Sequence, residues 1–359
     1  MLNYLLRKCF YALLVLFGVV STIFFLFNVL PGDPASIMLG QRANKEAIDA
    51  IHKDLGTDQA LGIQYLNYLN DLSPVSLHSL NAENAFWYLN KDKYTWLPLL
   101  QIGRHKVLVL KQPYLRRSYI TKRHVADIIR ETLPETAVLA VSAILIATVL
   151  GIALGVLTAI KKNSFFDRSV FVLATVFGMS APSFLVGLLV AWLFGYLLAQ
   201  YTGLGPSGSL FELDVWAGQQ MQLKNLILPA ITLGVRPLSI VIQLTRSSLL
   251  EVLSQDYIRT AKAKGLSFSK VVMKHALKNA LNPVVTAISG WFAGLMAGAV
   301  FVEKIFSWKG IGNEVVEALN NNDLPVVMGA TLIFACIFIV INIVVDIIYG
   351  LLDPRVRIQ

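Results

Sequence analysis

Charged side chains are scarce in this sequence. Asp, Glu, Lys and Arg make up 15% of its 359 residues, against roughly 25% in a typical soluble domain. Hydrophobic residues make up 55%. So few polar side chains would leave a water-soluble protein of this length without a polar surface. The composition therefore argues against a soluble enzyme, a disordered chain and a nucleic-acid-binding module.

Cysteine is also rare, and motifs for catalysis are missing. The two cysteines, Cys9 and Cys336, lie inside apolar runs, so neither a disulfide nor a metal framework is predicted. The sequence contains no Gly-Lys dipeptide, which excludes a phosphate-binding P-loop, and it contains neither HExxH nor G-x-S-x-G. We therefore expect this chain to bind no metal or cofactor of its own and not to be an enzyme.

Long uncharged runs take the place of these features. A transmembrane helix needs roughly 20 apolar residues to cross a hydrocarbon core about 30 Å thick. Six runs predict an all-α integral membrane protein with six transmembrane helices: Cys9–Gly32, Thr136–Ile160, Ser169–Gln200, Leu226–Leu244, Asn279–Val302 and Leu324–Val345. The fourth is the weakest, because it contains Arg236. The first exceeds the apolar length of a signal peptide and lacks a small-residue cleavage pattern, so a retained helix is expected.

Lysine and arginine are distributed unevenly between the loops. With six spans, fourteen of them fall on the side of both termini and three in the short loops of the other side. Positively charged loops stay in the cytoplasm. The sequence therefore predicts a multi-pass protein of the cytoplasmic (inner) membrane with both termini cytoplasmic. The segment 33–131 carries thirteen more, but it is long enough to be translocated regardless of charge.

Three regions follow from this topology: an N-terminal transmembrane helix (1–32), a large external segment between the first and second spans (33–131), and a core with five transmembrane helices (132–359). In the external segment the apolar spacing predicts one helix between Asn44 and Gly56 and a second from Asp58 to Leu72. A short strand is expected at Val107–Leu110. The segment is interpreted as a cap packed on the bundle, a docking surface for an external partner, or both.

The loop between the fourth and fifth spans is the most informative part of the sequence. Residues Asp256 to Lys264 have the pattern of a short amphipathic helix, and Gly265 is placed to end it. Ser267 is expected to cap a second amphipathic helix that carries Lys270, Lys274 and Lys278. From these residues alone, the loop either lies on anionic lipid or receives a protein partner on the cytoplasmic side.

These residues resemble a known family. Arg259-Thr260-Ala261, followed after three residues by Gly265, is similar to the EAA loop of permease subunits of bacterial ABC importers, with Arg-Thr-Ala in place of Glu-Ala-Ala. This variant is similar to the dipeptide/oligopeptide/nickel permease branch. Three further stretches resemble the same branch: Leu30–Pro34, Arg117–Thr136 and Phe301–Gly329. Residues 75–110 match it poorly and are predicted to be an insertion.

The resemblance implies a division of labour. This chain would form half of a translocation pathway together with a second permease subunit. Two ABC ATPase subunits, which hold ATP and Mg, would dock on the cytoplasmic loops, and an external solute-binding protein would deliver the solute. Peptides are the expected solute, and nickel or another small solute is the alternative. An ion-coupled carrier fits less well, because the spans contain almost no ionisable residues.

Two sets of site residues follow. The resemblance implies a loop that couples the permease to its ATPases, made of Asp256, Tyr257, Arg259, Thr260, Ala261, Lys264, Gly265 and Leu266. The second candidate is Arg236, which either pairs inside the bundle or lines the pathway. A charged side chain within a span is costly unless it has a partner or water, so either role requires a neighbour that compensates it.

Overall fold

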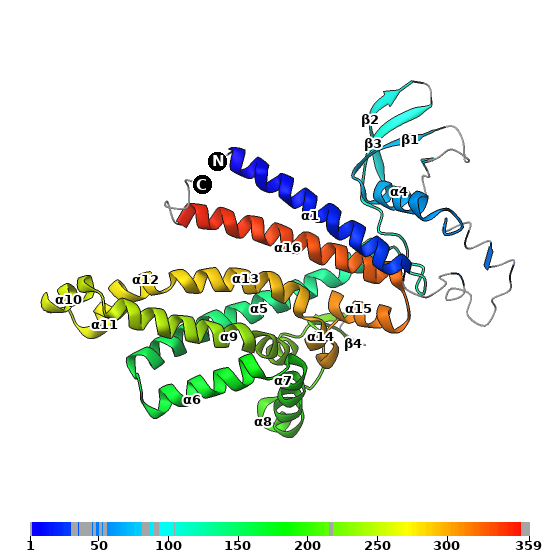
Figure 1. The fold of residues 1–359 in the computed structure, drawn as a ribbon. Helices are drawn as coiled ribbons and strands as arrows, with labels where there is room; N and C mark the ends of the chain where they lie inside the picture. Colours follow the sequence, from blue (N-terminus) through cyan, green and yellow to red (C-terminus); the bar gives the residue numbers. More distant parts are fainter. Residues whose placement is uncertain are drawn as a thin grey trace. The chain divides into compact units, whose positions relative to one another are not determined.

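The computed structural model of the chain describes residues 2–29, 35, 45, 48–49, 52, 56–80, 87–89, 93–103, 105–214 and 218–352. Among these residues, four helices are long and apolar enough to cross a membrane: α1 (Leu2–Val29), α5 (Val125–Ile160), α9 (Lys224–Leu253) and α16 (Leu324–Leu352). Two bent helix pairs bring the candidate spans to six if each pair crosses once. The chain is thus a predominantly helical membrane protein, as predicted (Figure 1).

The third predicted span, Ser169–Gln200, is not one continuous helix. The first half is α6 (Phe165–Leu173) with a π-helical continuation η2 (Ala174–Ser180), and the second half is α7 (Ser183–Val190) continued by η3 (Ala191–Leu197). The two halves meet at 116°. Pro182 lacks an N–H and disfavours helical geometry at the preceding residue, and Ala181 is accordingly extended, with ψ 136°. The prediction of a single helix was wrong.

Two other spans differ from their predicted bounds. The fifth is divided into α12 (Leu277–Ala280), α13 (Asn282–Gly298) and α14 (Val300–Phe306), and the last two are bent by 58°. The fourth is longer than predicted, because α9 continues past Leu244 to Leu253. A charge at Arg246 suggested a loop there, but an ion pair described below allows the helix to continue.

By its internal contacts the chain divides into two compact units, residues 1–131 with 317–336 and residues 132–316 with 337–359. In the first unit, α1 packs against α4 (Leu61–Leu72) and the beginning of α16. Phe24, Tyr68 and Met328 bring these three elements together in one buried apolar cluster. This cluster stabilises the first unit by removing large apolar side chains from water.

The helix α4 confirms the second predicted helix of the external segment. It ends at Ser73 as expected, but its N-cap is Ala60 and not Asp58, and no side chain caps it. The first predicted helix, between Asn44 and Gly56, lies mostly outside the described residues. Gly56 itself is described and has a φ of +69°, which suits its predicted role as a stop.

A small sheet occupies the stretch predicted to be an insertion. It consists of β1 (Val75–Ser79), β2 (Trp96–Ile102) and β3 (Lys106–Lys111), antiparallel and in the order β1-β3-β2. β3 confirms the predicted strand at Val107–Leu110, whose alternating side chains are buried on one face. The strands β1 and β2 were not predicted, so the all-helical expectation is incomplete in this segment.

A buried polar cluster joins α4 to this sheet. Asp71, at the end of α4, accepts a hydrogen bond from Tyr94 Oη at 2.5 Å and pairs with Lys93 Nζ at 2.7 Å. Lys111 Nζ lies 3.9 Å from the centre of the Tyr94 ring, which is within range of a cation–π interaction. Burial lowers the pKa of Lys111 to about 8 and raises the pKa of Tyr94, whose proton Asp71 also holds.

The second unit contains the remaining helices and a short hairpin. Its further elements are α8 (Ala199–Thr202), β4 (Phe211–Asp214), β5 (Gly218–Met221), α10 (Asp256–Ala263), α11 (Phe268–Lys270), η4 (Val271–Ala276) and α15 (Ile311–Asn320), whose last residues belong to the first unit. Its larger apolar cluster includes Leu139 of α5, Leu233 of α9 and Phe306 of α14. This cluster holds α9 against its neighbours. α9 carries Arg236 and leads directly into α10, and these are the two sites described next.

Candidate functional site

The predicted coupling loop forms a short helix directly after α9. Gln255 is the N-cap of α10, which runs from Asp256 to Ala263. Gly265 follows with a φ of +75°, so it ends the helix as the sequence predicted. Ser267 is the N-cap of the next helical segment as expected, but its side chain makes no capping hydrogen bond. Figure 1 shows α10 and α11 close together, where α9 ends and α12 begins.

One face of α10 is buried against the ends of two long helices. Ile258 is 0% exposed and Ala261 is 7% exposed. Both belong to a buried cluster that also contains Val156 of α5, Leu249 of α9 and Val272 of η4. Ala261, predicted to take part in coupling, is therefore a packing residue, and its small side chain allows α10 to lie close to its neighbours. α10 is consequently anchored to α5 and α9.

The opposite face of α10 is open. Four of the predicted coupling residues are exposed on α10, namely Asp256, Tyr257, Arg259 and Thr260, and Lys264 is exposed directly after it. Tyr257 Oη accepts a hydrogen bond from Asn279 Nδ2 at 2.9 Å, and Thr260 Oγ1 donates to the carbonyl of Asp256. Leu266 is half-buried at the edge of the cluster. The structure thus brings the predicted residues together on α10 and the turn that ends it, with buried apolar side chains on one side and exposed charged and aromatic side chains on the other.

The segment that follows Ser267, predicted to be a second amphipathic helix, has its apolar residues on the buried side and its lysines on the exposed side, as the sequence pattern indicated. Val271 and Val272 are buried in the same cluster, whereas Lys270, Lys274 and Lys278 are exposed. The segment is not one regular α-helix, because π-helical turns interrupt it between α11 and α12. The lysines can face lipid or protein, so both interpretations of this face stay open on geometry alone.

An ion pair that the sequence reasoning missed connects α9 to α6. Arg246 Nε donates to Asp167 Oδ1 at 2.7 Å and Arg246 Nη2 donates to Asp167 Oδ2 at 2.8 Å. The Asp167 side chain is only 4% exposed. These residues are 79 positions apart, and Arg246 was assigned to a loop, so neither spacing nor periodicity pointed to the pair. The only available signal was that a carboxylate follows Ser164 at the start of a helix.

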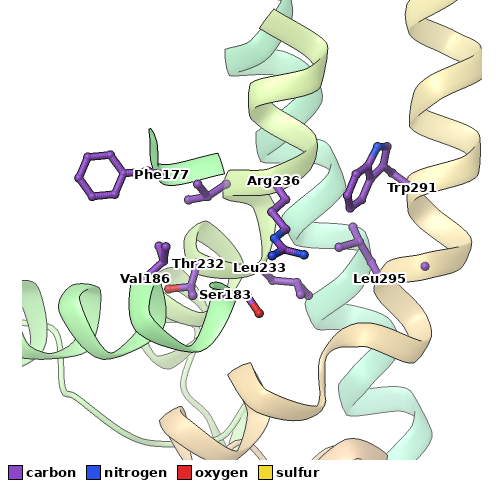
Figure 2. Close-up of a pocket in the computed structure, with 10 residues that line it drawn as sticks. Phe177, Ser183, Val186, Thr232, Leu233, Arg236, Trp291 and Leu295 are labelled. Carbon is purple, nitrogen blue, oxygen red and sulfur yellow. The ribbon is translucent and has the colours of Figure 1, made fainter. Parts of the chain in front are cut away.

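Arg236, the second predicted site residue, borders a cavity of about 190 Å³ in the second unit. The cavity lies at the break between η2 and α7, and it is also lined from α9 and α13. Figure 2 shows the Arg236 guanidinium with the Ser183 hydroxyl and, across from them, Trp291 and Leu295. Arg236 is exposed, and it makes no hydrogen bond or ion pair with any residue that the structure describes. The pairing inside the bundle that was one alternative for Arg236 is therefore not observed in this part of the chain.

Metal-binding geometry does not occur in the described part of the chain, where no group of three or more His, Cys, Asp or Glu side chains is arranged to hold an ion. The Nε2 atom of His78, a potential metal ligand, lies 2.8 Å from Ser76 Oγ in a hydrogen bond.

The two candidate sites in the described part of the chain are the surface formed by α10 and the cavity bordered by Arg236. Neither arrangement resembles a catalytic centre, since no nucleophile is paired with a base in them.

Comparison with known proteins identifies the family to which the chain belongs. The family model of the binding-protein-dependent transport system inner membrane component matches residues 151–358, and the N-terminal model of the same system matches residues 1–81. The di/tripeptide transport system permease protein DppB of Pseudomonas aeruginosa (strain UCBPP-PA14) is 35% identical over 376 aligned positions that cover all of both chains. The glutathione transport system permease protein GsiC of Escherichia coli (strain K12) is 33% identical and covers 99% of each chain.

A solved structure shares the fold. A chain of the MetNI methionine ABC transporter in inward-facing conformations superposes with a TM-score of 0.51 at 17% identity, over 64% of this chain and 97% of that chain. At this identity the likeness shows only the helical arrangement. The family models and the full-length relatives show more, and the chain belongs to the family of inner membrane components of binding-protein-dependent transport systems, which are ABC importer permeases.

Proposed function

We propose that this chain is the permease subunit of an ATP-driven importer of peptides and forms half of the pathway across the cytoplasmic membrane. Peptides are proposed as the substrate because the chain is similar, over its whole length, to permeases named for dipeptides, di/tripeptides and glutathione. Nothing in the geometry or in these relatives favours nickel. Because the sequence contains no Gly-Lys dipeptide and hence no P-loop, we assign ATP and Mg to partner subunits.

The exposed face of α10 supports docking of an ATPase at this loop. The buried side of α10 is packed against α5 and α9. A movement of a docked ATPase would therefore be transmitted to these helices better through α10 than through a flexible loop. Two ATPase subunits, a second permease subunit and an external solute-binding protein complete the proposed assembly. In this arrangement both termini and α10 are cytoplasmic, and the small sheet is external, in keeping with the distribution of Lys and Arg.

The proposal can be tested by measuring solute uptake in a strain that lacks this chain. Uptake of radiolabelled dialanine and of radioactive nickel would be measured in the deletion strain and after complementation. The proposal predicts that dialanine uptake falls and is restored by the wild-type chain, while nickel uptake is unchanged. A loss of nickel uptake with normal uptake of dialanine and trialanine would establish the alternative solute instead.

A further inference from the structure

Arg236 differs sharply from the other arginine on the same membrane-spanning helix. It lies twelve residues after the first residue of α9, about 18 Å along the helix axis, which is too deep for its side chain to reach water beyond the membrane. Ten residues later, Arg246 is fully engaged by Asp167. Arg236 has no acid or carbonyl partner among the described residues. Arg236 is exposed in this chain, so its charge within the span is compensated by water in the cavity or by an anion that enters it.

The polar groups around Arg236 include hydrogen-bond donors and no carboxylate. Ser183 lines the same cavity and is the first residue of α7. In that first turn the amides of Leu185 and Val186 bond the carbonyl of Pro182, so the amides of Ser183 and Phe184 remain at the positive end of the helix dipole. No Asp or Glu lines the cavity. The electrostatic complement of this set of groups is an anion.

Apart from Arg236 and Ser183, the lining of the cavity is mostly apolar. Thr232 lines it from α9 and is 3% exposed, and its hydroxyl is buried away from the cavity surface. The remaining walls are apolar, formed by Phe177, Val186, Leu233, Trp291 and Leu295. The volume, about 190 Å³, is below that of a pocket for a whole ligand, so it suits one end of a larger molecule.

We propose that this cavity is a carboxylate-binding subsite of the pathway, in which Arg236 and the start of α7 bind the C-terminal carboxylate of a peptide in transit. This inference rests on the proposed function. The planar guanidinium matches a carboxylate with two parallel hydrogen bonds, and the apolar walls receive the adjoining side chain. Every linear peptide has this carboxylate, so binding at the terminus gives affinity without selecting the sequence of the peptide.

The charge preference of the cavity can be measured with a cysteine introduced in place of Ser183. The complete transporter, with Cys9→Ala and Cys336→Ala in this chain, would carry Ser183→Cys and be treated with an anionic and a cationic methanethiosulfonate reagent. The ratio of the two rates would be normalised to that of an exposed cysteine introduced by Ser269→Cys. We expect a ratio about tenfold in favour of the anionic reagent, since one nearby unscreened charge contributes more than 1.4 kcal/mol.

Matched variants separate the subsite from a structural role of Arg236. Arg236→Gln should abolish the preference, Arg236→Lys should keep it, and Arg168→Gln, which neutralises an exposed arginine of α6, should leave it unchanged. Free dialanine at millimolar concentration, without the solute-binding protein, should slow the reaction of the thiol introduced by Ser183→Cys, whereas dialanine amide should not. If Arg236→Gln fails to assemble, the rate ratio and the protection by dialanine in the Ser183→Cys chain still decide the matter.

The outcomes that overturn the proposal are distinct. No preference for the anionic reagent, or equal protection by dialanine and its amide, contradicts a carboxylate subsite. Protection that depends on phosphatidylglycerol in the vesicles, and not on peptide, shows that Arg236 serves a lipid phosphate. If the preference and its dependence on Arg236 hold, but the wild-type transporter moves no peptide, the cavity binds a carboxylate and the proposed peptide function fails instead.

Discussion

Arg246 of α9 and Asp167 of α6 form a two-pronged ion pair, with N–O distances of 2.7 and 2.8 Å. Asp167 also accepts a hydrogen bond from the amide of Asn163, and its own amide donates to Ser164 Oγ. The pair therefore fixes the first turn of α6 to the same helix that leads into α10. We therefore expect a displacement of α10 to reach α6, and the break that follows it, through this contact.

Breaking this pair should weaken both the fold and the coupling. Asp167→Asn leaves a half-buried guanidinium without its counter-charge, and loss of one partner of a buried pair costs about 3 kcal/mol. We expect a lower apparent unfolding temperature of the purified chain in detergent and a lower rate of dialanine transport. Arg246→Lys should retain part of the stability, since it keeps the charge and loses the bidentate geometry.

The double variant Asp167→Asn with Arg246→Gln provides the control for this prediction. If the two groups act on each other, the double variant is more stable than the sum of the single losses predicts. Arg168→Gln, which removes the neighbouring exposed charge, should change little. Strictly additive losses from Asp167→Asn and Arg246→Gln would contradict the connection between α6 and α9.

Gly265→Val should uncouple transport from ATP hydrolysis without preventing assembly. Gly265 has a φ of +75°, and a Cβ there would meet no atom within 4 Å. The cost is therefore backbone strain, about 1–2 kcal/mol, and the helix should change direction to relieve it. We expect normal amounts of complex in the membrane, with slow peptide uptake and ATP hydrolysis that no longer responds to the loaded binding protein. Gly265→Asn should be milder, since asparagine tolerates this conformation.

Substitution of the lysines tests the competing role of the loop as a lipid anchor. If attraction to anionic lipid is its main contribution, changing Lys270, Lys274 and Lys278 to alanine together should reduce transport more than Gly265→Val does. Our account predicts the reverse order. Normal uptake and normal stimulated hydrolysis in Gly265→Val would show that α10 does not couple the two.

Substitutions of Ile258 and Arg259 should distinguish the anchoring of α10 to the bundle from the docking of an ATPase on it. Ile258→Ala opens a cavity in the cluster beneath α10 and should cost about 3 kcal/mol of stability, because Ile258 is 0% exposed. Arg259→Ala changes an exposed residue and should leave the unfolding temperature of the isolated chain unchanged, but it should reduce the amount of ATPase that co-purifies. The prediction fails if Arg259→Ala destabilises the chain as much as Ile258→Ala does.

Lys111 should make the sheet of β1, β3 and β2 more stable as the pH rises. Its pKa is about 8 in the fold and 10.5 ordinarily, so the unfolded state binds more protons between these values. Stability consequently increases with pH across this window, and the cost of burying the charge is full below pH 8. Tyr94, with its raised pKa, acts in the opposite direction only above about pH 10.

Hydrogen exchange of the β3 amides can measure this effect. In the full chain in lipid nanodiscs, protection corrected for the intrinsic exchange rate should rise from pH 7.5 to pH 9.5. Lys111→Met should remove the pH dependence, because it replaces the buried ammonium by an apolar side chain of similar length. A protection that falls with pH in this range, or an unchanged slope in Lys111→Met, would contradict the assignment.

The sequence predicted those features that depend on short-range signals. Gly265 marks the C-terminal end of α10, and Ser267 marks the start of the following helical segment. The alternation of buried and more exposed side chains at Val107–Leu110 marks β3. Pro182 was an equally clear local signal for the break in the third span. The uniform apolar character of Ser169–Gln200 outweighed it, since length and hydropathy do not distinguish a straight span from a bent one.

Long-range partners were beyond such reasoning. The pairing of Asp167 with Arg246 depends on how α6 packs against α9, and both charges lay in loops outside the predicted spans Ser169–Gln200 and Leu226–Leu244. Arg236 was identified as unusual from its position in a span. Its cavity could not be predicted, because the cavity exists only where the break before Ser183 meets α9 and α13.

Reconstitution tests the central claim most directly. Proteoliposomes that contain this chain, its partner permease, both ATPases and the solute-binding protein should accumulate labelled dialanine when ATP is supplied on the side that α10 faces. Accumulation should stop when this chain is omitted or when ATP cannot be hydrolysed. ATP-independent accumulation, or undiminished uptake without this chain, would show that it is not the permease of an ATP-driven peptide importer.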